Sequence, residues 1–343
     1  MKERIRYIDA MRGFTMFLVV FGHVMLDTFG LGGYTSVIGS IFLTFRMPMF
    51  FFISGYIAYK GIEYWTGDFF KERLAKKAKV QIIPALFFFS LFCYTRGNNP
   101  LIVVEHNGWL GYWFTFVLFE MFIAYYILSL IGKLISDKVV DIGLIVLSCM
   151  GVLWLMYANR GLQIYEITCM ENLAKYFQFF TFGILCRKYN NAFMRWMSND
   201  YFKAGVIMLF IACICFYFED SLKVSLPFVY SFNHDILVRY IGVLLVFCFF
   251  FTKKEYFNKD NRITRIFLFV GRRTLDIYLI HFFFLPQMKY LKEWLMPSNM
   301  LLIQFTLATL ISFLVIGASL LMSEVIRSSN FLAHYLFGVK RVQ

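Results

Sequence analysis

The chain has 343 residues, of which 60% are hydrophobic and only 16% are charged. Soluble globular proteins are roughly half apolar and about a quarter charged, so a soluble fold of this composition would lack a polar surface. The net charge of +13 does not indicate a nucleic-acid partner. The basic residues fall mostly in alternate loops between apolar runs, which is the pattern of a membrane topology.

Apolar runs long enough to cross a bilayer, for which about 20 residues are needed, recur along the whole sequence. We therefore predict an all-α integral membrane protein with about ten transmembrane helices. They form a single domain over residues 1–343, with the helices roughly at 11–322 and a tail at 323–343. The predicted spans are 11–26, 37–59, 80–94, 110–131, 139–157, 172–186, 204–218, 236–251, 274–290 and 300–322.

The first predicted helix contains Arg12 and His23. Ionisable residues are costly in a bilayer and persist there only with a partner or a function. The two residues are eleven positions apart, about 16 Å of helical rise, so they lie on nearly the same face. Asp27 follows His23 one turn later. Because the run carries these residues and lacks a small-x-small cleavage site, we interpret it as a membrane helix and not as a signal peptide.

The second predicted helix has Arg46 two residues before Pro48. Proline lacks the amide hydrogen, so a carbonyl in the preceding turn is left free. Such a break beside a buried cation is typical of a cavity lining, and an ion pair between Arg46 and Glu120 is the alternative. Ser54 and Gly55 lack the strand-to-helix turn and the preceding Gly of a nucleophile elbow. They predict close helix packing instead.

The helices in the middle of the chain carry fewer ionisable residues. Trp113 opens the fourth predicted helix and Glu120 lies inside it. Lys175 and Arg239 each lie a few residues into a helix from its predicted outer end. At that depth they either extend outward to the interface or contact an anionic acceptor.

The ninth predicted helix begins after the pair Arg272 and Arg273, with Thr274 as its cap. Tyr278 and His281 lie inside it, and His281 is about two turns from the start. This depth would let His281 reach a cavity within the helix bundle. Packing of the Tyr-x-x-His segment is the equal alternative.

The distribution of charge predicts the topology. Most of the 34 Lys and Arg residues lie at the amino terminus, in the even-numbered loops and in the tail. Both termini are therefore predicted to be cytoplasmic. The seven cysteines have no CxxC spacing and no neighbouring His, so we predict neither a disulfide nor a metal site. Membrane lipids are the partners that the apolar surface predicts.

Five segments occur in an order that is characteristic of one family of membrane enzymes. They are Arg12 and His23 with ten residues between them, 45–56 (FRMPMFFFISGY), Trp113-Phe114, 176–185 (YFQFFTFGIL) and 271–281 (GRRTLDIYLIH). In this ordered set, over nearly its whole length, the chain resembles the acyltransferase family 3 membrane proteins. Two features depart from the family pattern: Arg46 stands where His is frequent, and Glu120 lies seven residues after Trp113 instead of five.

The resemblance implies a membrane O-acyltransferase. Such an enzyme moves an acyl group, often acetyl, from cytoplasmic acyl-coenzyme A to a hydroxyl of a carbohydrate or lipid-linked glycan, at the membrane or its outer face. It also implies a multi-pass protein in the cytoplasmic membrane of a bacterium. No esterase-like domain is expected, so the chain would act as a stand-alone transferase.

Acyl transfer to an alcohol needs a base for the hydroxyl proton and a site for the oxyanion. His23 is the candidate base, and Asp27 or Glu120 would orient its ring; the alternative is a polar contact that joins two helices. The candidate contacts to the phosphates of coenzyme A are Arg12, Arg73, Lys77, Arg272 and Arg273. Topology signals and lipid-phosphate contacts are the alternative for these five. The candidate contacts to the thioester oxygen or the acceptor are Arg46, Trp113, Tyr278 and His281.

Two other classes of function remain open. A secondary transporter or flippase of a glycan or small metabolite also has about ten helices with buried charges. No charged, Pro-interrupted helix in the second half matches the second helix, which argues against inverted repeats. A catalytically silent structural component is the third class, and it predicts that Arg12 and His23 are dispensable.

Overall fold

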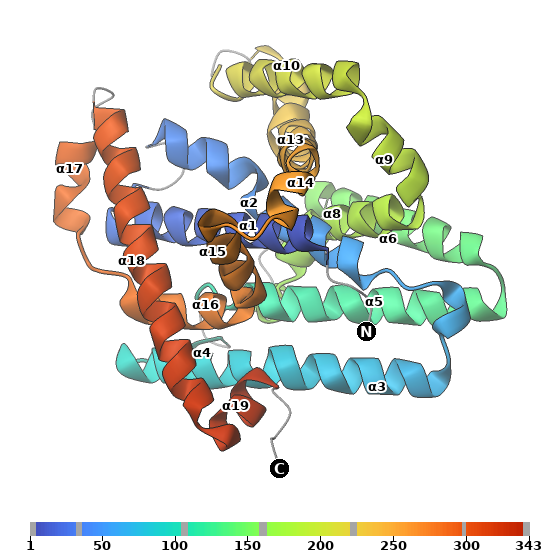
Figure 1. Cartoon of the computed structure of the whole chain (residues 1–343), viewed down its shortest axis with the longest axis horizontal. Coiled ribbons are helices and arrows are strands. Elements are labelled where there is room, and N and C mark those ends of the chain that lie inside the picture. Colours follow the sequence, from blue (N-terminus) through green and yellow to red (C-terminus); the bar gives the residue numbers. More distant parts are fainter. Residues whose placement is uncertain are drawn as a thin grey trace. The chain divides into compact units, whose positions relative to one another are not determined.

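The computed structural model describes residues 5–31, 36–103, 109–157, 163–219, 225–296 and 300–338. Every regular element within these ranges is a helix, and no strand occurs among them. The all-α prediction is therefore confirmed. Figure 1 shows the helices coloured along the sequence.

Eight helical stretches within the described ranges are long and apolar enough to cross a membrane. They are Arg6–Thr28, Val37–Ala58, Gly67–Thr95, Trp113–Leu134, Asp137–Tyr157, Asp200–Tyr217, Phe228–Thr252 and Leu301–Ser328. These stretches are those of a multi-pass membrane protein. The total of ten spans and the cytoplasmic position of both termini stay predictions.

Two of the predicted spans take a different form in the structure. The span 172–186 lies within α8 (Met170–Lys188), which is helical but carries Glu171, Lys175, Arg187 and Lys188 in nineteen residues. The span 274–290 is a short helix, Thr274–Phe284, which ends two residues before Pro286. Proline disfavours helical backbone in the residue before it, which explains the early end.

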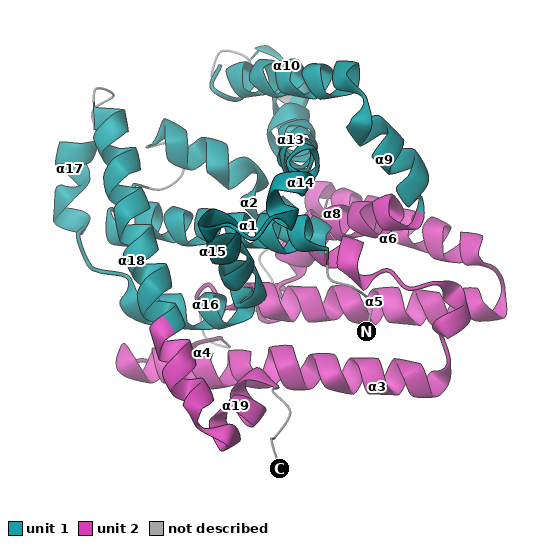
Figure 2. Ribbon diagram, viewed as in Figure 1, with its two compact units in different colours: residues 1–53, 189–320 teal, residues 54–188, 321–343 magenta. Residues whose placement is uncertain are grey.

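The chain divides into two compact units, each formed from two separate stretches of sequence (Figure 2). Unit 1 comprises residues 1–53 and 189–320, and unit 2 comprises residues 54–188 and 321–343. The helices α2 (Val37–Ala58) and α18 (Leu301–Ser328) each pass from unit 1 into unit 2. The single domain over residues 1–343 stays a prediction.

Unit 1 is built around the first helix, α1 (Arg6–His23), which continues as the π-helical turn η1 (Val24–Thr28). Its other helices are α9 (Asn190–Ser198), α10 (Asp200–Tyr217), α12 (Pro227–Phe232), η6 (Asn233–Leu237), α13 (Val238–Thr252), α14 (Lys254–Asn258), α15 (Arg262–Arg272), α16 (Thr274–Ile280), η7 (His281–Phe284), η8 (Lys289–Leu291) and α17 (Lys292–Leu295). Helix α1 packs against α13, α14, α15 and α16. Most of its side chains are buried in this core.

Glycines allow α1 and α15 to cross with their backbones in contact. A Cβ atom added at Gly13 would overlap the carbonyl of Phe267, and one added at Gly271 would overlap the carbonyl of Asp9. A side chain at either position would push the helices apart. The crossing therefore fixes the start of α16 relative to α1, and α16 leads directly to His281.

Unit 2 is a bundle of helices. Its members are η3 (Ile62–Tyr64), α3 (Gly67–Lys77), η4 (Ala78–Ile82), α4 (Ile83–Thr95), α5 (Trp113–Leu134), α6 (Asp137–Tyr157), α7 (Gln163–Ile167), α8 and α19 (Asn330–Phe337). Of these, α4, α5 and α6 are strongly apolar. Helix α6 packs on α5 and α8. The end of α2 approaches α8 so closely that a Cβ atom on Gly55 would overlap the carbonyl of Phe180. The small residue at position 55 thus permits close helix contact, as the sequence predicts.

Candidate active site

The carboxyl end of α1 brings His23 and Asp27 together. His23 is the last residue of α1, and Asp27 lies in the π-helical turn that follows. Asp27 Oδ2 is 2.8 Å from His23 Nδ1. Because an ionised carboxylate only accepts hydrogen bonds, Nδ1 carries the proton, and the lone pair of a neutral ring is on Nε2. The π-helical turn, a rare element that is frequent at functional sites, therefore presents one imidazole nitrogen as a proton acceptor.

A guanidinium group lies beside this pair. Arg46 belongs to α2 and is buried, with 9% of its surface exposed. A Cβ atom on Gly22 would overlap the Arg46 guanidinium, so the space beside the backbone of Gly22 is the space that the guanidinium fills. Arg46 therefore places a positive charge next to the residue that precedes His23.

A second histidine faces the first from another helix. His281 begins η7 and is fully buried, and its ring centroid is 5.1 Å from that of His23. Its Nδ1 lies 3.0 Å from the carbonyl oxygen of Ile277 and 2.8 Å from that of Tyr278. Carbonyl oxygens only accept, so Nδ1 donates and Nε2 carries the lone pair. That Nε2 atom is buried and has no hydrogen-bond partner among the residues that the structure describes.

Phe282 packs against both rings, with centroid distances of 4.8 Å to His23 and 4.0 Å to His281. Its apolar face covers the histidine pair and limits the motion of both rings. The opposite side is more open, because the side chain of Asp27 is 41% exposed and that of His23 is 18% exposed. We call His23, Asp27, Arg46 and His281 the histidine cluster.

Three of the five basic residues predicted to bind phosphate gather near the other end of α1. Arg12 donates to Thr274 Oγ1 at 2.8 Å. Arg272 and Arg12 both lie near Asp9, at 4.0 Å and 3.7 Å. The guanidinium of Arg273 is 3.4 Å from Asp276. Unit 1 thus contains a histidine cluster at one end of α1 and an arginine group near the other.

The other two predicted phosphate ligands belong to unit 2, where both pack on aromatic rings. The Arg73 guanidinium lies 4.6 Å from the ring centroid of Phe69, and Lys77 Nζ lies 3.6 Å from that of Phe122. These contacts are cation–π interactions, which hold the two cations against apolar surface.

Trp113 and Glu120 also lie in unit 2, both on α5. The Trp113 ring stacks on that of Tyr176, with a centroid distance of 5.7 Å and an interplanar angle of 13°. Glu120 Oε2 is buried without a hydrogen-bond partner in the described part of the chain. Of the two acids predicted to orient His23, Asp27 is the one that contacts it within unit 1. The pairing of Arg46 with Glu120 stays a prediction.

Comparison with protein families gives a match over residues 5–322, nearly the whole chain, to the acyltransferase domain of family 3. The chain belongs to acyltransferase family 3. Comparison with curated proteins and with solved structures gave no significant match. The family and the apolar helices together identify a multi-pass membrane acyltransferase.

The five sequence segments that are characteristic of the family lie in both units. Unit 1 contains Arg12, His23 and the segment 271–281, and unit 2 contains Trp113 and the segment 176–185. The segment 45–56 is divided between them. Tyr278 lies in the unit 1 part and is 5% exposed; its carbonyl holds His281, and its ring centroid is 6.2 Å from that of His281.

The sequence does not point to two residues of the candidate site. Gly22 makes room for Arg46, and Phe282 covers the two histidines. Each directly adjoins a predicted site residue, His23 or His281, and this adjacency is the only signal in the sequence. Glycine and phenylalanine have no reactive group, so neither residue type by itself indicates a functional site. Gly22 acts by its small size and Phe282 by its packing.

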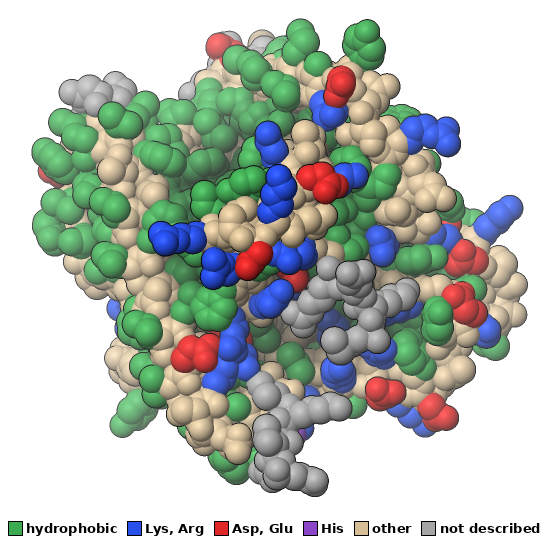
Figure 3. All heavy atoms as spheres, in the orientation of Figure 1, with side chains coloured by type: hydrophobic (Ala, Val, Ile, Leu, Met, Phe, Trp, Pro, Cys, Tyr) green, Lys and Arg blue, Asp and Glu red, His purple; other side chains and the backbone are tan. Residues whose placement is uncertain are grey.

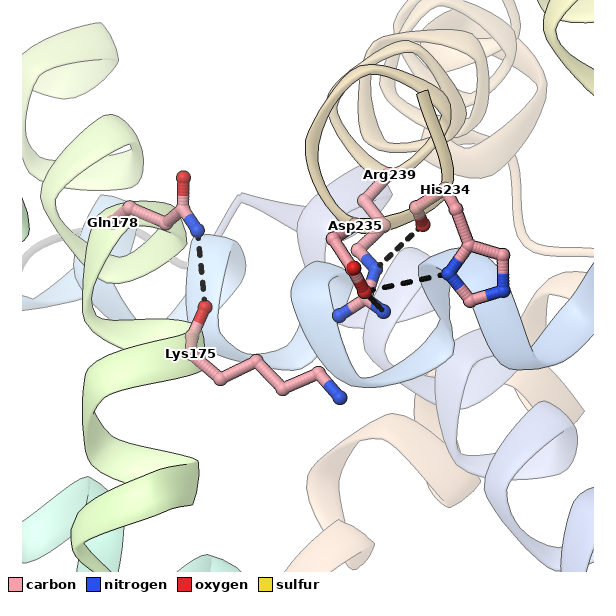
Figure 4. Close-up of polar contacts among 5 residues, drawn as sticks. All are labelled: Lys175, Gln178, His234, Asp235 and Arg239. Atoms are coloured by element: carbon pink, nitrogen blue, oxygen red, sulfur yellow. Dashed lines mark hydrogen bonds and ion pairs between the residues drawn. The ribbon is translucent and has the colours of Figure 1, made fainter. Parts of the chain in front are cut away.

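A further polar cluster lies around η6 in unit 1 (Figure 4). Arg239 donates to Asp235 Oδ1 at 2.8 Å and to the carbonyl of His234 at 3.3 Å. The His234 ring stacks on Tyr217 at a centroid distance of 4.4 Å. In unit 2, Gln178 donates to the carbonyl of Lys175 at 3.1 Å. Arg239 therefore forms an ion pair within its own helix turn.

Proposed function

We propose that this acyltransferase moves an acyl group from acyl-coenzyme A to a hydroxyl group, with His23 as the general base. The supporting observation is the contact of His23 Nδ1 with Asp27, which directs the lone pair of a neutral ring to Nε2. A base of this kind, held by a carboxylate from behind, is the arrangement used to activate hydroxyl groups in many enzymes.

In the proposed reaction, His23 Nε2 takes the proton of the acceptor hydroxyl as its oxygen attacks the thioester carbonyl carbon. The new C–O bond forms, the C–S bond breaks, and the leaving thiolate takes the proton back from the imidazolium. Arg46 would stabilise the negative charge that develops on the carbonyl oxygen. His281 Nε2 would accept a hydrogen bond from the acceptor, because it is a buried acceptor within the same cluster.

The donor would bind through its phosphates to the guanidinium groups near the amino-terminal end of α1. Arg12, Arg272 and Arg273 support this assignment, because they lie close together and keep exposed fractions of their side chains of 31%, 50% and 22%. Guanidinium groups suit phosphate through bidentate hydrogen bonds. We also propose Arg73 and Lys77 as contacts to the donor phosphates and Trp113 as a contact to the acceptor.

We propose acetyl as the acyl group and a carbohydrate or lipid-linked glycan as the acceptor. We also propose that the donor is taken from the cytoplasm, in the cytoplasmic membrane of a bacterium. The family supports this choice, since the chain matches it over residues 5–322.

The test is the transfer of radiolabel from acetyl-coenzyme A to the glycan and lipid fractions of membranes that contain the wild-type chain or His23→Ala. Loss of a general base lowers the rate by about 10²- to 10⁴-fold. His334→Ala is a matched control, because it removes a histidine that instead contacts Lys79. Equal label from His23→Ala and the wild type would exclude His23 from the mechanism. Uptake of a glycan without any acyl transfer would favour the transporter alternative.

A further inference from the structure

Unit 1 contains a cavity of about 1080 Å³ that lies apart from the histidine cluster. Three helices line it, and its walls are almost entirely apolar. Phe14 and Phe17 of α1, Ile266 and Phe269 of α15, and Phe313 and Ile316 of α18 supply much of the lining. Ligand pockets in proteins measure about 300–1,000 Å³, so this cavity has room for a large apolar molecule.

The charged residues in the lining are mostly basic. Arg6, Arg265 and Arg272 line the cavity, and Asp260 is the only acid among the lining residues that the structure describes. Arg6 is fixed by its donation to the carbonyl of Phe257 at 3.0 Å. The side chain of Arg265 is 65% exposed, and its nearest acidic partner, Asp260, is 3.4 Å away and 72% exposed. The cavity thus combines apolar walls with a net positive charge.

Helix α15 has the character of a helix that lies in the membrane interface. Ile263, Ile266 and Phe269 recur every third residue and are 53%, 60% and 44% exposed. Basic residues flank this apolar stripe, and Figure 3 shows Lys and Arg side chains gathered over α14 and α15. Helices with an apolar face and a basic polar face bind at the boundary between headgroups and acyl chains.

We propose that the cavity between α1, α15 and α18 binds an anionic glycerophospholipid. The acyl chains would occupy the apolar walls, and the phosphate headgroup would contact Arg265 with Arg6 nearby. Charge complementarity carries this choice of occupant, because the lining has three arginines and one aspartate. A zwitterionic lipid would gain less from this charge, since a basic side chain near an anionic membrane surface contributes about 1 kcal/mol, which is about fivefold in affinity.

Gly317 provides a direct test, because it lines the cavity and a Cβ atom there would meet nothing within 4 Å. Gly317→Leu would therefore place an apolar side chain at the cavity wall where its Cβ atom meets no other atom. Gly205→Leu is the matched control, since a Cβ atom there also has open space, and it lies on α10 away from the cavity. Arg265→Gln tests the charge, and Arg262→Gln removes an equal charge from the same helix outside the lining.

The experiment is a titration of the full-length protein in detergent with dioleoyl phosphatidylglycerol or dioleoyl phosphatidylcholine, with bound lipid counted by native mass spectrometry. We expect the wild type to prefer phosphatidylglycerol. Gly317→Leu should weaken its binding at least about tenfold, and Arg265→Gln should lower the preference about fivefold. Both control variants should bind as the wild type does, and size-exclusion chromatography should show all five proteins to be monodisperse.

Three outcomes would overturn the proposal. Wild-type binding by Gly317→Leu would show that the cavity is not occupied. Equal binding of the two lipids would show that the charge of the headgroup does not affect binding. Displacement of phosphatidylglycerol by palmitoyl-coenzyme A or by inorganic phosphate alone would assign the cavity to another ligand. The acyl-transfer assay with Gly317→Leu is separate from these readouts, so failure of the proposed reaction would not affect this test.

Discussion

Backbone groups position the reactive side chains around His23 as much as other side chains do. His281 is held by two carbonyl oxygens of its own helix, and the Arg46 guanidinium fills the space that Gly22 leaves. The ring of His23 is held by a side-chain partner, Asp27. Substitutions that exchange only a few atoms of these side chains should therefore change the reaction rate more than the stability of the fold.

The partner of His23 can be tested with Asp27→Asn. An amide can either accept from a protonated Nδ1 or donate to an unprotonated Nδ1, so the ring would no longer be held in one tautomer. We expect the turnover number to fall about 10- to 100-fold, by analogy with the loss of partners that orient a histidine. Thermal unfolding should change little, because the pair is partly exposed. An unchanged turnover number would show that Asp27 does not orient the base.

The close approach of Gly22 and Arg46 predicts strong coupling between them. Gly22→Ala should lower the free energy of unfolding by about 1–3 kcal/mol, because the added methyl group overlaps the guanidinium. In an Arg46→Ala background the same change should cost much less. A double-mutant cycle from detergent unfolding curves measures this coupling, and additive effects would contradict the contact.

At the scale of helices, the crossing of α1 and α15 should be the least tolerant contact of unit 1. Gly271→Ala places a methyl group against the backbone of Asp9, which we expect to cost about 1–3 kcal/mol. Gly205→Ala has open space and should instead raise stability by up to about 1 kcal/mol, because alanine is the better helix former. Thermal unfolding of the two variants, compared with the wild type, should show opposite shifts.

Helices α6 and α8 of unit 2 are joined by Lys188, whose Nζ lies 2.7 Å from both Asp137 and Asp141. Burial lowers the pKa of Lys188, but its hydrogen bonds to the two carboxylates raise it more, so the pKa lies above its ordinary value. A raised lysine pKa stabilises the fold fully below the unfolded value of about 10.4, and this stability is lost as pH rises through the folded value.

The melting temperature should therefore fall more steeply above about pH 10.4 for the wild type than for Lys188→Met. At neutral pH the wild type should be the more stable protein, because the variant leaves two carboxylates without their cation. Parallel pH profiles for the two proteins would contradict this role of Lys188.

The long helices could be predicted because hydrophobic runs of membrane length are a strong local signal. Helix α8 and the segment 274–284 depart from this rule, the first through its four charged residues and the second through Pro286. The contact of His23 with Asp27 was accessible from their spacing by four residues. The contacts of Arg46 with Gly22 and of His23 with His281 were not, because they depend on how separate helices pack.

For the whole molecule, the number of membrane crossings and the charge of the loops must agree. Termini on the same side require an even number of crossings. The long apolar helices in the described ranges number eight. If all eight cross and both termini are cytoplasmic, helix α8 and Thr274–Phe284 must both cross the membrane or both remain on one side.

Cysteine labelling in intact cells tests this topology. In a variant without native cysteines, a membrane-impermeant maleimide should label Asn98→Cys directly. It should label Lys259→Cys and Asn330→Cys only after the membrane is permeabilised, because the basic loops are predicted to be cytoplasmic. All three positions are exposed in the structure. Direct labelling of Asn330→Cys would place the carboxyl terminus outside.

The π-helical turn after His23 also has a genetic consequence. Its hydrogen bond from Phe29 to the carbonyl of Val24 spans five residues, one more than in a regular α-helix. Deletion of Leu26 would let the chain continue as an ordinary helix, so the protein should still insert into the membrane. Asp27 would then follow His23 by three residues, so its carboxylate would approach the ring from a different direction. A deletion of one codon would thus change the contact between the proposed base and its carboxylate partner while the helix itself continues.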